Sequence, residues 1–90
     1  MKIEITSRNF IISKELKDFV KSKIEKLSKY DKLIISSRII LLKESRAEKV
    51  ELIIISKNKR YIAKCHSSSF EKTIIQAADK IKTQILRTKK

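Results

Sequence analysis

Glycine, proline and tryptophan are absent from this chain of 90 residues, and cysteine and histidine occur once each. Without glycine the chain cannot form a glycine-rich phosphate-binding loop or a dinucleotide-binding fingerprint. The single Cys65 excludes an internal disulfide and is typical of a reducing compartment. Cys65 and His66 are neighbours in an expected strand, so their side chains point to opposite faces and form neither a catalytic pair nor a metal site. We therefore expect no enzyme activity, no cofactor, no metal and no small-molecule substrate.

Long apolar runs are also missing. No run approaches the roughly 20 residues that a membrane-spanning helix needs. The opening residues Met1 to Glu4 contain no apolar segment of the secretory kind. The sequence therefore predicts a cytoplasmic protein without a membrane partner.

Positive charge is what the chain has in excess. It carries 23 Lys and Arg against 10 Asp and Glu, which gives a formal net charge of +13. A compact domain with this excess repels itself, so the charge indicates a polyanionic partner, nucleic acid first and an anionic membrane surface second. The hydrophobic fraction of 41% is sufficient for a packed core, and we expect one folded domain over residues 1–90.

Two kinds of apolar periodicity indicate the fold. Strands are expected over residues 2–6, 37–43, 50–56 and 61–67, and helices over 13–30 and 69–90. The strand over 37–43 is apolar on both faces, which favours a central position in the sheet. A turn is expected at 57–60, with Asn58 in the left-handed conformation that glycine would otherwise supply. The sequence thus predicts an α+β fold in the order β-α-β-β-β-α, with one four-stranded sheet and two helices packed on one face.

Both expected helices are amphipathic and begin at a serine. The hydroxyl groups of Ser13 and Ser69 can each cap the first free amides of a helix. On the last helix, apolar residues from Phe70 to Ile85 face the core. The opposite side carries a ladder of polar side chains formed by Lys72, Gln76, Lys80, Thr83 and Arg87.

The lysines of the first helix are not scattered around it. Lys14, Lys17 and Lys21 share one flank of the apolar stripe. When the two helices pack side by side, we expect these lysines to form one outer surface together with Lys80 and Arg87. Long Lys side chains contact phosphate groups rather than base edges, and few aromatic residues are available for stacking on bases. This pattern indicates structured RNA that is read by its shape and backbone.

Lys23 does not fit the amphipathic pattern, because its angle places it close to the middle of the apolar side. Two interpretations remain open. The side chain either runs along the core until its ammonium group reaches solvent, or it lines a groove between the two helices.

Several short motifs follow one another along the chain in a fixed order. They are Ile5-Thr6-Ser7-Arg8-Asn9, Ile12-Ser13, Leu16-x-x-Phe19-Val20, Lys23 through Lys26-Leu27 to Tyr30, Asp79-Lys80-Ile81, Gln84-Ile85 and Arg87. Their order and spacing resemble the bacterial ribosome hibernation-promoting factors of the short form and the related ribosome-associated inhibitor A. The resemblance covers essentially the whole chain, and the family has the same β-α-β-β-β-α order.

The resemblance implies a protein that binds the small ribosomal subunit and its RNA. The binding site would be the channel that messenger and transfer RNA use near the decoding centre, and binding would inhibit translation under stress or in stationary phase. Ribosome dimers remain open as a further assembly. The resemblance assigns RNA contacts to Lys17, Lys23, Lys26, Lys80 and Arg87. The full set of expected RNA-binding residues is Lys14, Lys17, Lys21, Lys23, Lys26, Lys80, Arg87 and Lys90.

Two alternatives compete with this hypothesis. A generic double-stranded or structured RNA-binding domain has similar elements, but a double-stranded-RNA-binding domain relies on a lysine-rich motif at the start of its last helix. In this chain, residues 70–79 contain one lysine, Lys72, and therefore lack that motif. A peripheral membrane protein would use the apolar helix faces, which are needed here to cover the sheet. Ribosome hibernation is therefore the favoured hypothesis.

Overall fold

The computed structural model describes residues 1–57 and 59–88 and confirms the predicted order of strands and helices. The expected conformation of Asn58 and the expected RNA contact of Lys90 lie outside the described residues. The elements are β1 (Lys2–Arg8), α1 (Lys14–Glu25), the short 3-10 helix η1 (Lys26–Lys29), β2 (Ile34–Lys43), β3 (Glu48–Ser56), β4 (Arg60–Ser67) and α2 (Phe70–Thr88).

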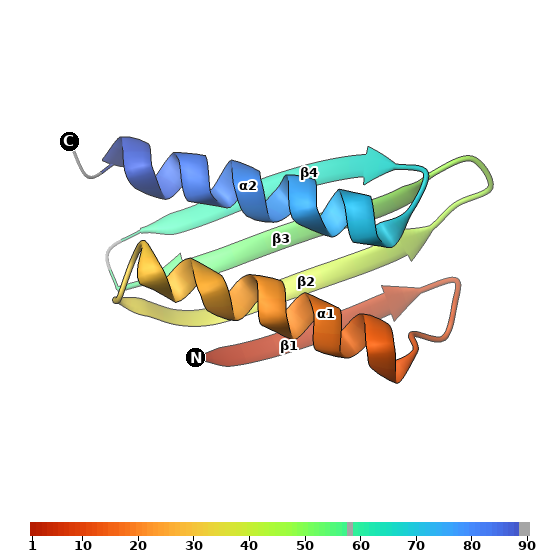
Figure 1. The fold of residues 1–90 in the computed structure, drawn as a ribbon, viewed down its shortest axis with the longest axis horizontal. Helices are drawn as coiled ribbons and strands as arrows, with labels where there is room; N and C mark the ends of the chain where they lie inside the picture. Colours follow the sequence, from red (N-terminus) through yellow and green to blue (C-terminus); the bar gives the residue numbers. More distant parts are fainter. Residues whose placement is uncertain (58, 89–90) are drawn as a thin grey trace.

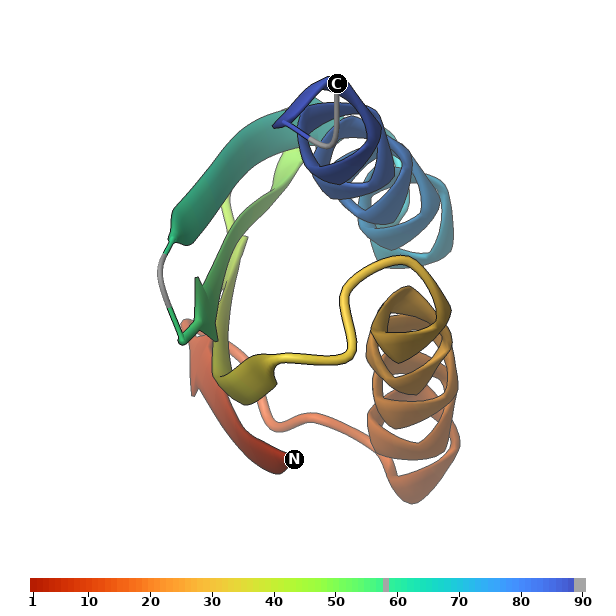
Figure 2. The same cartoon turned by 90° about the vertical axis from the view of Figure 1, so that its left-hand side faces the viewer.

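The four strands form one mixed sheet in the order β1-β2-β3-β4. β1 pairs with β2 in parallel, and the other two pairs are antiparallel. α1 therefore forms the crossover between the parallel strands. As predicted, both helices cover the same face: α1 lies over β1 and β2, and α2 lies over β3 and β4 (Figures 1 and 2). None of the helices in the described ranges lies on the opposite face of the sheet (Figure 2).

The core lies between the sheet and the helical layer. Alternate residues of the strands point into it, and the predicted apolar faces of the helices meet them. The prediction that the strand around 39–42 is central is confirmed, because β2 lies between β1 and β3. Its side chains that are fully buried against the helices are Ile39 and Leu41, and they pack in one cluster with Val20, Ile24, Leu52, Ile54, Ile74, Ala77, Ile81 and Ile85.

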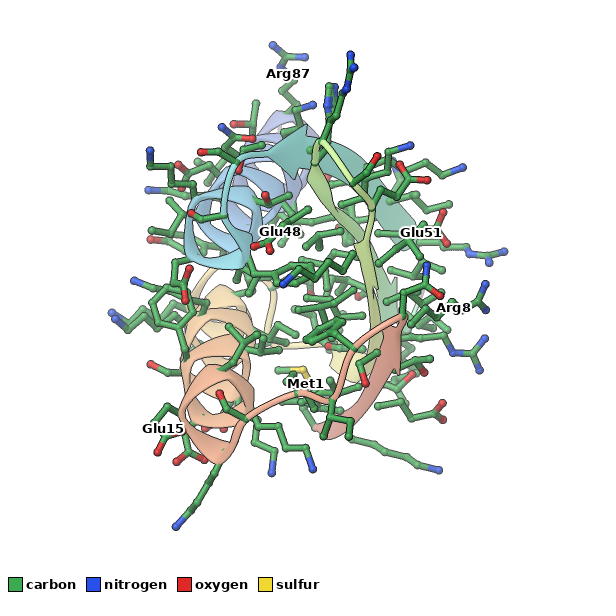
Figure 3. The ribbon with its side chains drawn as sticks, turned by 90° about the vertical axis from the view of Figure 1, so that its right-hand side faces the viewer. Met1, Arg8, Glu15, Glu48, Glu51 and Arg87 are labelled. Atoms are coloured by element: carbon green, nitrogen blue, oxygen red, sulfur yellow. The ribbon has the colours of Figure 1, made fainter. Side chains whose placement is uncertain are left out.

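Serine caps begin both helices, as predicted. The Ser13 hydroxyl accepts a hydrogen bond from the amide of Leu16 at 3.1 Å, and the Ser69 hydroxyl accepts one from the amide of Lys72 at 3.3 Å. A Glu48 carboxylate oxygen accepts a further bond from the amide of Phe70 at 2.7 Å. This carboxylate lies between the start of α2 and the sheet (Figure 3), where the amide-rich end of a helix attracts negative charge.

Several element boundaries differ from the sequence prediction. β2 begins at Ile34 and β3 at Glu48, three and two residues earlier than expected. β1 continues to Arg8, and the chain turns at Asn9, whose φ of 69° lies in the left-handed region that asparagine tolerates. The first α-helix ends at Glu25 rather than near Tyr30, because the next turn tightens into η1. The Ser28 hydroxyl donates to the Glu25 carbonyl oxygen at 2.7 Å, which gives that carbonyl a partner outside the α-helical pattern.

Within the described ranges 1–57 and 59–88, neither helix offers an apolar stretch of the length that crossing a membrane requires.

Candidate nucleic-acid interface

The helical layer carries many of the exposed positive charges of the molecule. On α1 and η1, the side chains of Lys14, Lys17, Lys21 and Lys26 are exposed, and Lys23 is half-buried. On α2, Lys80 and Arg87 are exposed. The helix periodicity positions all of them outside the core, because Val20, Ile24, Ile81 and their neighbours occupy the faces that cover the sheet.

A groove runs between the two helices, and we call it the interhelical groove. It has a volume of about 160 Å³. One side of it is formed by α1, η1 and the residue that follows η1, and the other side by α2. The lining residues are Lys23, Lys26, Leu27, Tyr30, Ile75, Ala78, Asp79 and Lys82. Of the two interpretations of Lys23, the groove is the one that the structure shows.

Two ammonium groups of this groove lie close to aromatic rings. The Nζ atom of Lys23 is 5.4 Å from the centre of the Phe19 ring, and that of Lys82 is 5.0 Å from the centre of the Tyr30 ring. A ring face attracts a cation at this distance. The two rings therefore hold the ammonium groups of Lys23 and Lys82 beside the groove, and the aliphatic part of each lysine side chain lines it.

Lys14, Lys17 and Lys21 lie on the other flank of α1. Successive residues of an α-helix are rotated by about 100°. Relative to Lys23, which lines the interhelical groove, all three side chains therefore point to the flank that faces away from α2. Their expected common flank is confirmed, but that flank is not the one that meets the second helix.

Lys80 and Arg87 likewise point away from the first helix. Lys80 lines a hollow of about 420 Å³ at the β4 edge together with Lys64, His66 and Gln76. Lys82, two residues further on, faces the interhelical groove instead. Figure 3 shows Arg87 projecting from the side of α2 that is remote from α1.

The expected single surface of five basic residues is therefore wrong. The structure brings Lys23 and Lys26 together in the interhelical groove, and Lys21 shares a second hollow of about 580 Å³ with Lys26. Lys14 and Lys17 lie with Lys21 on the flank of α1 that faces away from α2, whereas Lys80 lies at the β4 edge. Helix phase alone gives the angle of a side chain relative to the core. Which flank meets the neighbouring helix depends on the strand order and on the path of the crossover. The periodicity of a single helix carries no information about either.

Lys82 was missed as a candidate residue, although a signal for it exists in the sequence. It lies about 100° from the buried Ile81 on the flank of α2 opposite to Lys80, where Ile75 and Ala78 also lie. If the neighbouring helix packs against this flank of α2, a basic residue at position 82 faces that helix. The groove thus contains three lysines against Asp79.

This arrangement suits electrostatic contact with a phosphate backbone. Lysine ammonium groups bind phosphate as point charges and are insensitive to base identity. Phe19 and Tyr30 already lie against lysine side chains, so they do not form an open platform for bases. Within the described part of the chain, no three His, Cys, Asp or Glu side chains gather as metal ligands do.

Comparisons with known proteins agree with this architecture. The family model described as sigma 54 modulation protein / S30EA ribosomal protein matches residues 3–90. A search of curated proteins finds no significant sequence match. Among solved structures, a ribosomal subunit interface protein from Coxiella burnetii superposes with a TM-score of 0.91 at 21% sequence identity, covering 99% of this chain and 98% of that chain.

A second solved structure is the N-terminal domain of Protein Y from Thermus thermophilus. It superposes with a TM-score of 0.89 at 20% identity and covers 98% of this chain and 99% of that chain. At these identities the structures establish a shared fold, and the family match over nearly the whole sequence establishes the relationship. The chain therefore belongs to the sigma 54 modulation protein / S30EA ribosomal protein family, the family of the ribosome hibernation-promoting factors.

Proposed function

We propose that this protein is a ribosome hibernation factor. It binds the small ribosomal subunit in the channel for messenger and transfer RNA near the decoding centre, and it inhibits translation under stress or in stationary phase. The observation that carries the proposal is the family match over residues 3–90. The solved relative from Coxiella burnetii is itself described as a ribosomal subunit interface protein, which supports the same partner here.

The distribution of charge favours a channel over a flat RNA surface. Basic side chains occupy the interhelical groove and also both outer flanks, with Lys17 and Lys21 on one flank and Lys80 on the other. A duplex that lies against one side of the molecule can reach only part of this set. RNA that surrounds the helical layer on several sides can reach all of it. This geometry favours the ribosomal channel over the generic double-stranded RNA-binding alternative.

In this proposal the lysines of the groove and flanks neutralise backbone phosphates and hold the protein in place. Inhibition then follows from occupancy, because the protein fills space that messenger and transfer RNA require. The proposed role includes no chemical reaction, and the proposed location is the cytoplasm, on ribosomes.

Competition on purified small subunits tests the proposal. Subunits are loaded with messenger RNA and initiator transfer RNA, and the protein is added in excess. We expect both RNAs to be released as the protein binds, which pelleting through a sucrose cushion measures. A poly-lysine peptide of equal charge is the control for displacement by charge alone. Stable simultaneous binding of the protein and both RNAs would contradict the channel mechanism.

A further inference from the structure

The face of the sheet that carries no helix has a regular composition. Strand alternation and register place four residues in each of four rows across it, one from each strand. In the order β1 to β4, the rows are Arg8, Leu42, Lys49 and His66; Thr6, Ile40, Glu51 and Lys64; Glu4, Arg38, Ile53 and Ile62; and Lys2, Ser36, Ile55 and Arg60.

Aliphatic residues form a diagonal across these rows, and we call it the aliphatic band. The band begins at Leu42 and Ile40 on β2 and continues to Ile53 and Ile55 on β3, with Ile62 beside it on β4. Ile55 and Ile62 are 42% and 43% exposed, and the other members are half-buried. No helix of the described chain covers them (Figure 2), so apolar surface remains in contact with water.

Basic residues border the aliphatic band on both sides. The face carries six Lys or Arg and two Glu, and both glutamates are already paired. Glu4 lies 3.4 Å from Arg38, and Glu51 lies 3.3 Å from Lys64. Among the described Lys and Arg residues of this face, Arg38, Lys49 and Lys64 make ion pairs, whereas Lys2, Arg8 and Arg60 make none.

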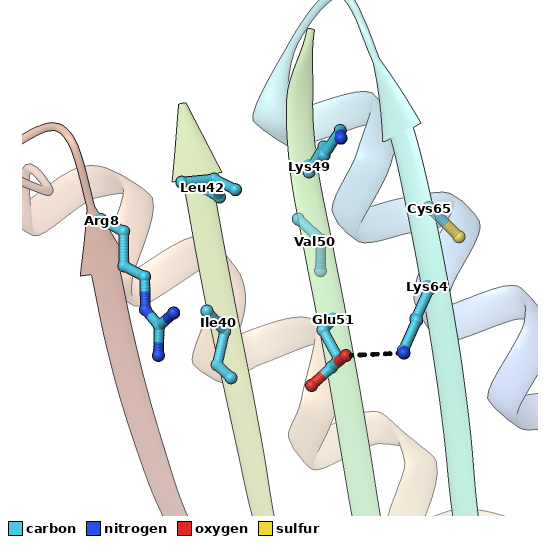
Figure 4. Close-up of a pocket in the computed structure, with 8 residues that line it drawn as sticks. All are labelled: Arg8, Ile40, Leu42, Lys49, Val50, Glu51, Lys64 and Cys65. Atoms are coloured by element: carbon cyan, nitrogen blue, oxygen red, sulfur yellow. Dashed lines mark ion pairs between the residues drawn. The ribbon is translucent and has the colours of Figure 1, made fainter. Parts of the chain in front are cut away.

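A pocket of about 250 Å³ lies at one end of the band (Figure 4). Ile40 and Leu42 contribute its apolar part, and the side chains of Arg8, Lys49, Glu51 and Lys64 lie around it. Figure 3 shows Arg8 and Glu51 projecting from the sheet on the side away from the helices. Such a pocket fits an apolar anchor side chain of a partner, with carboxylates beside it.

We propose that this face is a docking surface for an acidic amphipathic helix of a partner protein. Adjacent rows are two residues apart along a strand, so the band spans about 20 Å. A helix of about 14 residues has this length. Its apolar stripe covers the aliphatic band, its flanking carboxylates meet Arg8, Lys2 and Arg60, and the sheet then has helices on both faces.

Charge and shape disfavour two other occupants. A second copy would bring one positive face against another, in a molecule whose net charge is already +13. RNA phosphates would lie over the aliphatic band, which offers them no hydrogen-bond donor, and the sixteen outward positions include no Phe, Tyr or Trp on which bases could stack instead. An anionic membrane surface would also meet this charge, and the vesicle arm of the titration below separates it from a partner helix.

Titration of the ¹⁵N-labelled full chain, followed by NMR, tests the proposal. The probe is a helical peptide of about 14 residues with a leucine stripe flanked by glutamates. Two matched peptides replace the glutamates by lysine or the leucines by glutamine. We expect amide shifts at Ile40, Ile53 and Ile62 with the first peptide only. Ile40→Thr and Arg8→Gln are each expected to weaken binding by at least about fivefold, and Leu86→Thr, at an exposed position of α2, is expected to leave it unchanged.

Several results would overturn this inference. They are the absence of shifts on the sheet face, equal shifts with the peptide that lacks leucine, or shifts confined to the helices. If the amides of these rows shift with a short RNA or with phosphatidylglycerol vesicles but not with the acidic peptide, the face binds RNA or membrane instead. Concentration-dependent self-association through the band would assign it to a second copy. Because this titration contains no ribosome, its outcome is separate from that of the competition experiment.

Discussion

At the scale of single residues, Lys23 and Lys82 show how this chain holds positive charge next to a core. Each stem packs beside the interhelical groove, and each ammonium group lies near an aromatic ring, at 5.4 Å and 5.0 Å from the ring centres. Contacts of this kind are worth about 0.5–1 kcal/mol at exposed sites. They limit the positions that the side chains sample, so less side-chain conformational entropy is lost when the lysines bind phosphate.

A neighbouring pair on α2 separates residues that stabilise the fold from residues available for binding. Ile81 is completely buried, whereas Lys80 is exposed. We expect Ile81→Ala to lower the free energy of unfolding by about 2–5 kcal/mol, because it removes buried methyl groups and leaves a cavity. Lys80→Gln is expected to change it by no more than about 0.5 kcal/mol. Urea unfolding followed by circular dichroism measures both, and a large loss for Lys80→Gln would contradict the helical phase.

At the scale of elements, α2 protects the edge strand β4. The side-chain amide of Gln84 donates to the Ile62 carbonyl oxygen at 2.8 Å, and its oxygen accepts from the Ile62 amide at 3.3 Å. The glutamine therefore occupies main-chain groups that an edge strand would otherwise expose to another chain. The opposite edge strand, β1, has charged outward side chains at Lys2, Glu4 and Arg8, which also discourage pairing with another strand.

We expect Gln84→Ala to speed hydrogen exchange of the Ile62 amide. The variant loses both hydrogen bonds to Ile62, and the one that the Ile62 amide donates protects that amide directly. A contribution of about 0.5–1.5 kcal/mol from this bond corresponds to an increase of about 2- to 12-fold in the exchange rate. Gln76→Ala is the matched control, because Gln76 is an exposed glutamine on α2 and both changes introduce the same residue into the same helix. Equal acceleration in both variants would show that the helix as a whole, and not this side chain, protects the strand.

Most of the fold could be predicted from the sequence because local patterns specify it. Ser13 and Ser69 mark the helix starts, and the apolar spacing gives the faces that the structure buries. The division of the basic residues could not be predicted in the same way. Lys80 and Lys82 are both off the apolar face, and only the packing of α2 beside α1 determines which of them lines the groove.

The apolar residues of β2 illustrate a second limit. Ile40 and Leu42 belong to a run that is apolar on both faces, and a central strand is indeed what the run forms. Such runs usually occur where both faces of a sheet are covered. Here no helix of the described residues covers the outer face, and this difference is the observation behind the proposed docking surface.

At the scale of the whole molecule, positive charge surrounds the helical layer and also borders the bare sheet face. Attraction between a basic protein and RNA could therefore act through any side. The proposed function makes a narrower claim, because it assigns phosphate contacts to the helical layer. Three variants that each remove three positive charges can distinguish these cases, since substitution by glutamine keeps much of the stem length and helix propensity.

The last prediction concerns the salt dependence of binding to small subunits. Each phosphate contact contributes about 0.7–0.9 to the slope of log affinity against log salt. Removing Lys23, Lys26 and Lys82 from the groove should therefore make the slope shallower by about two to three units. The flank variant, which lacks Lys14, Lys17 and Lys21, should show a loss of similar size if RNA surrounds the layer. The sheet-face variant, which lacks Lys2, Arg8 and Arg60, should change the slope by less than about one unit. Equal changes in all three would indicate general charge attraction, and a change in the groove variant alone would indicate contact from one side rather than enclosure in a channel.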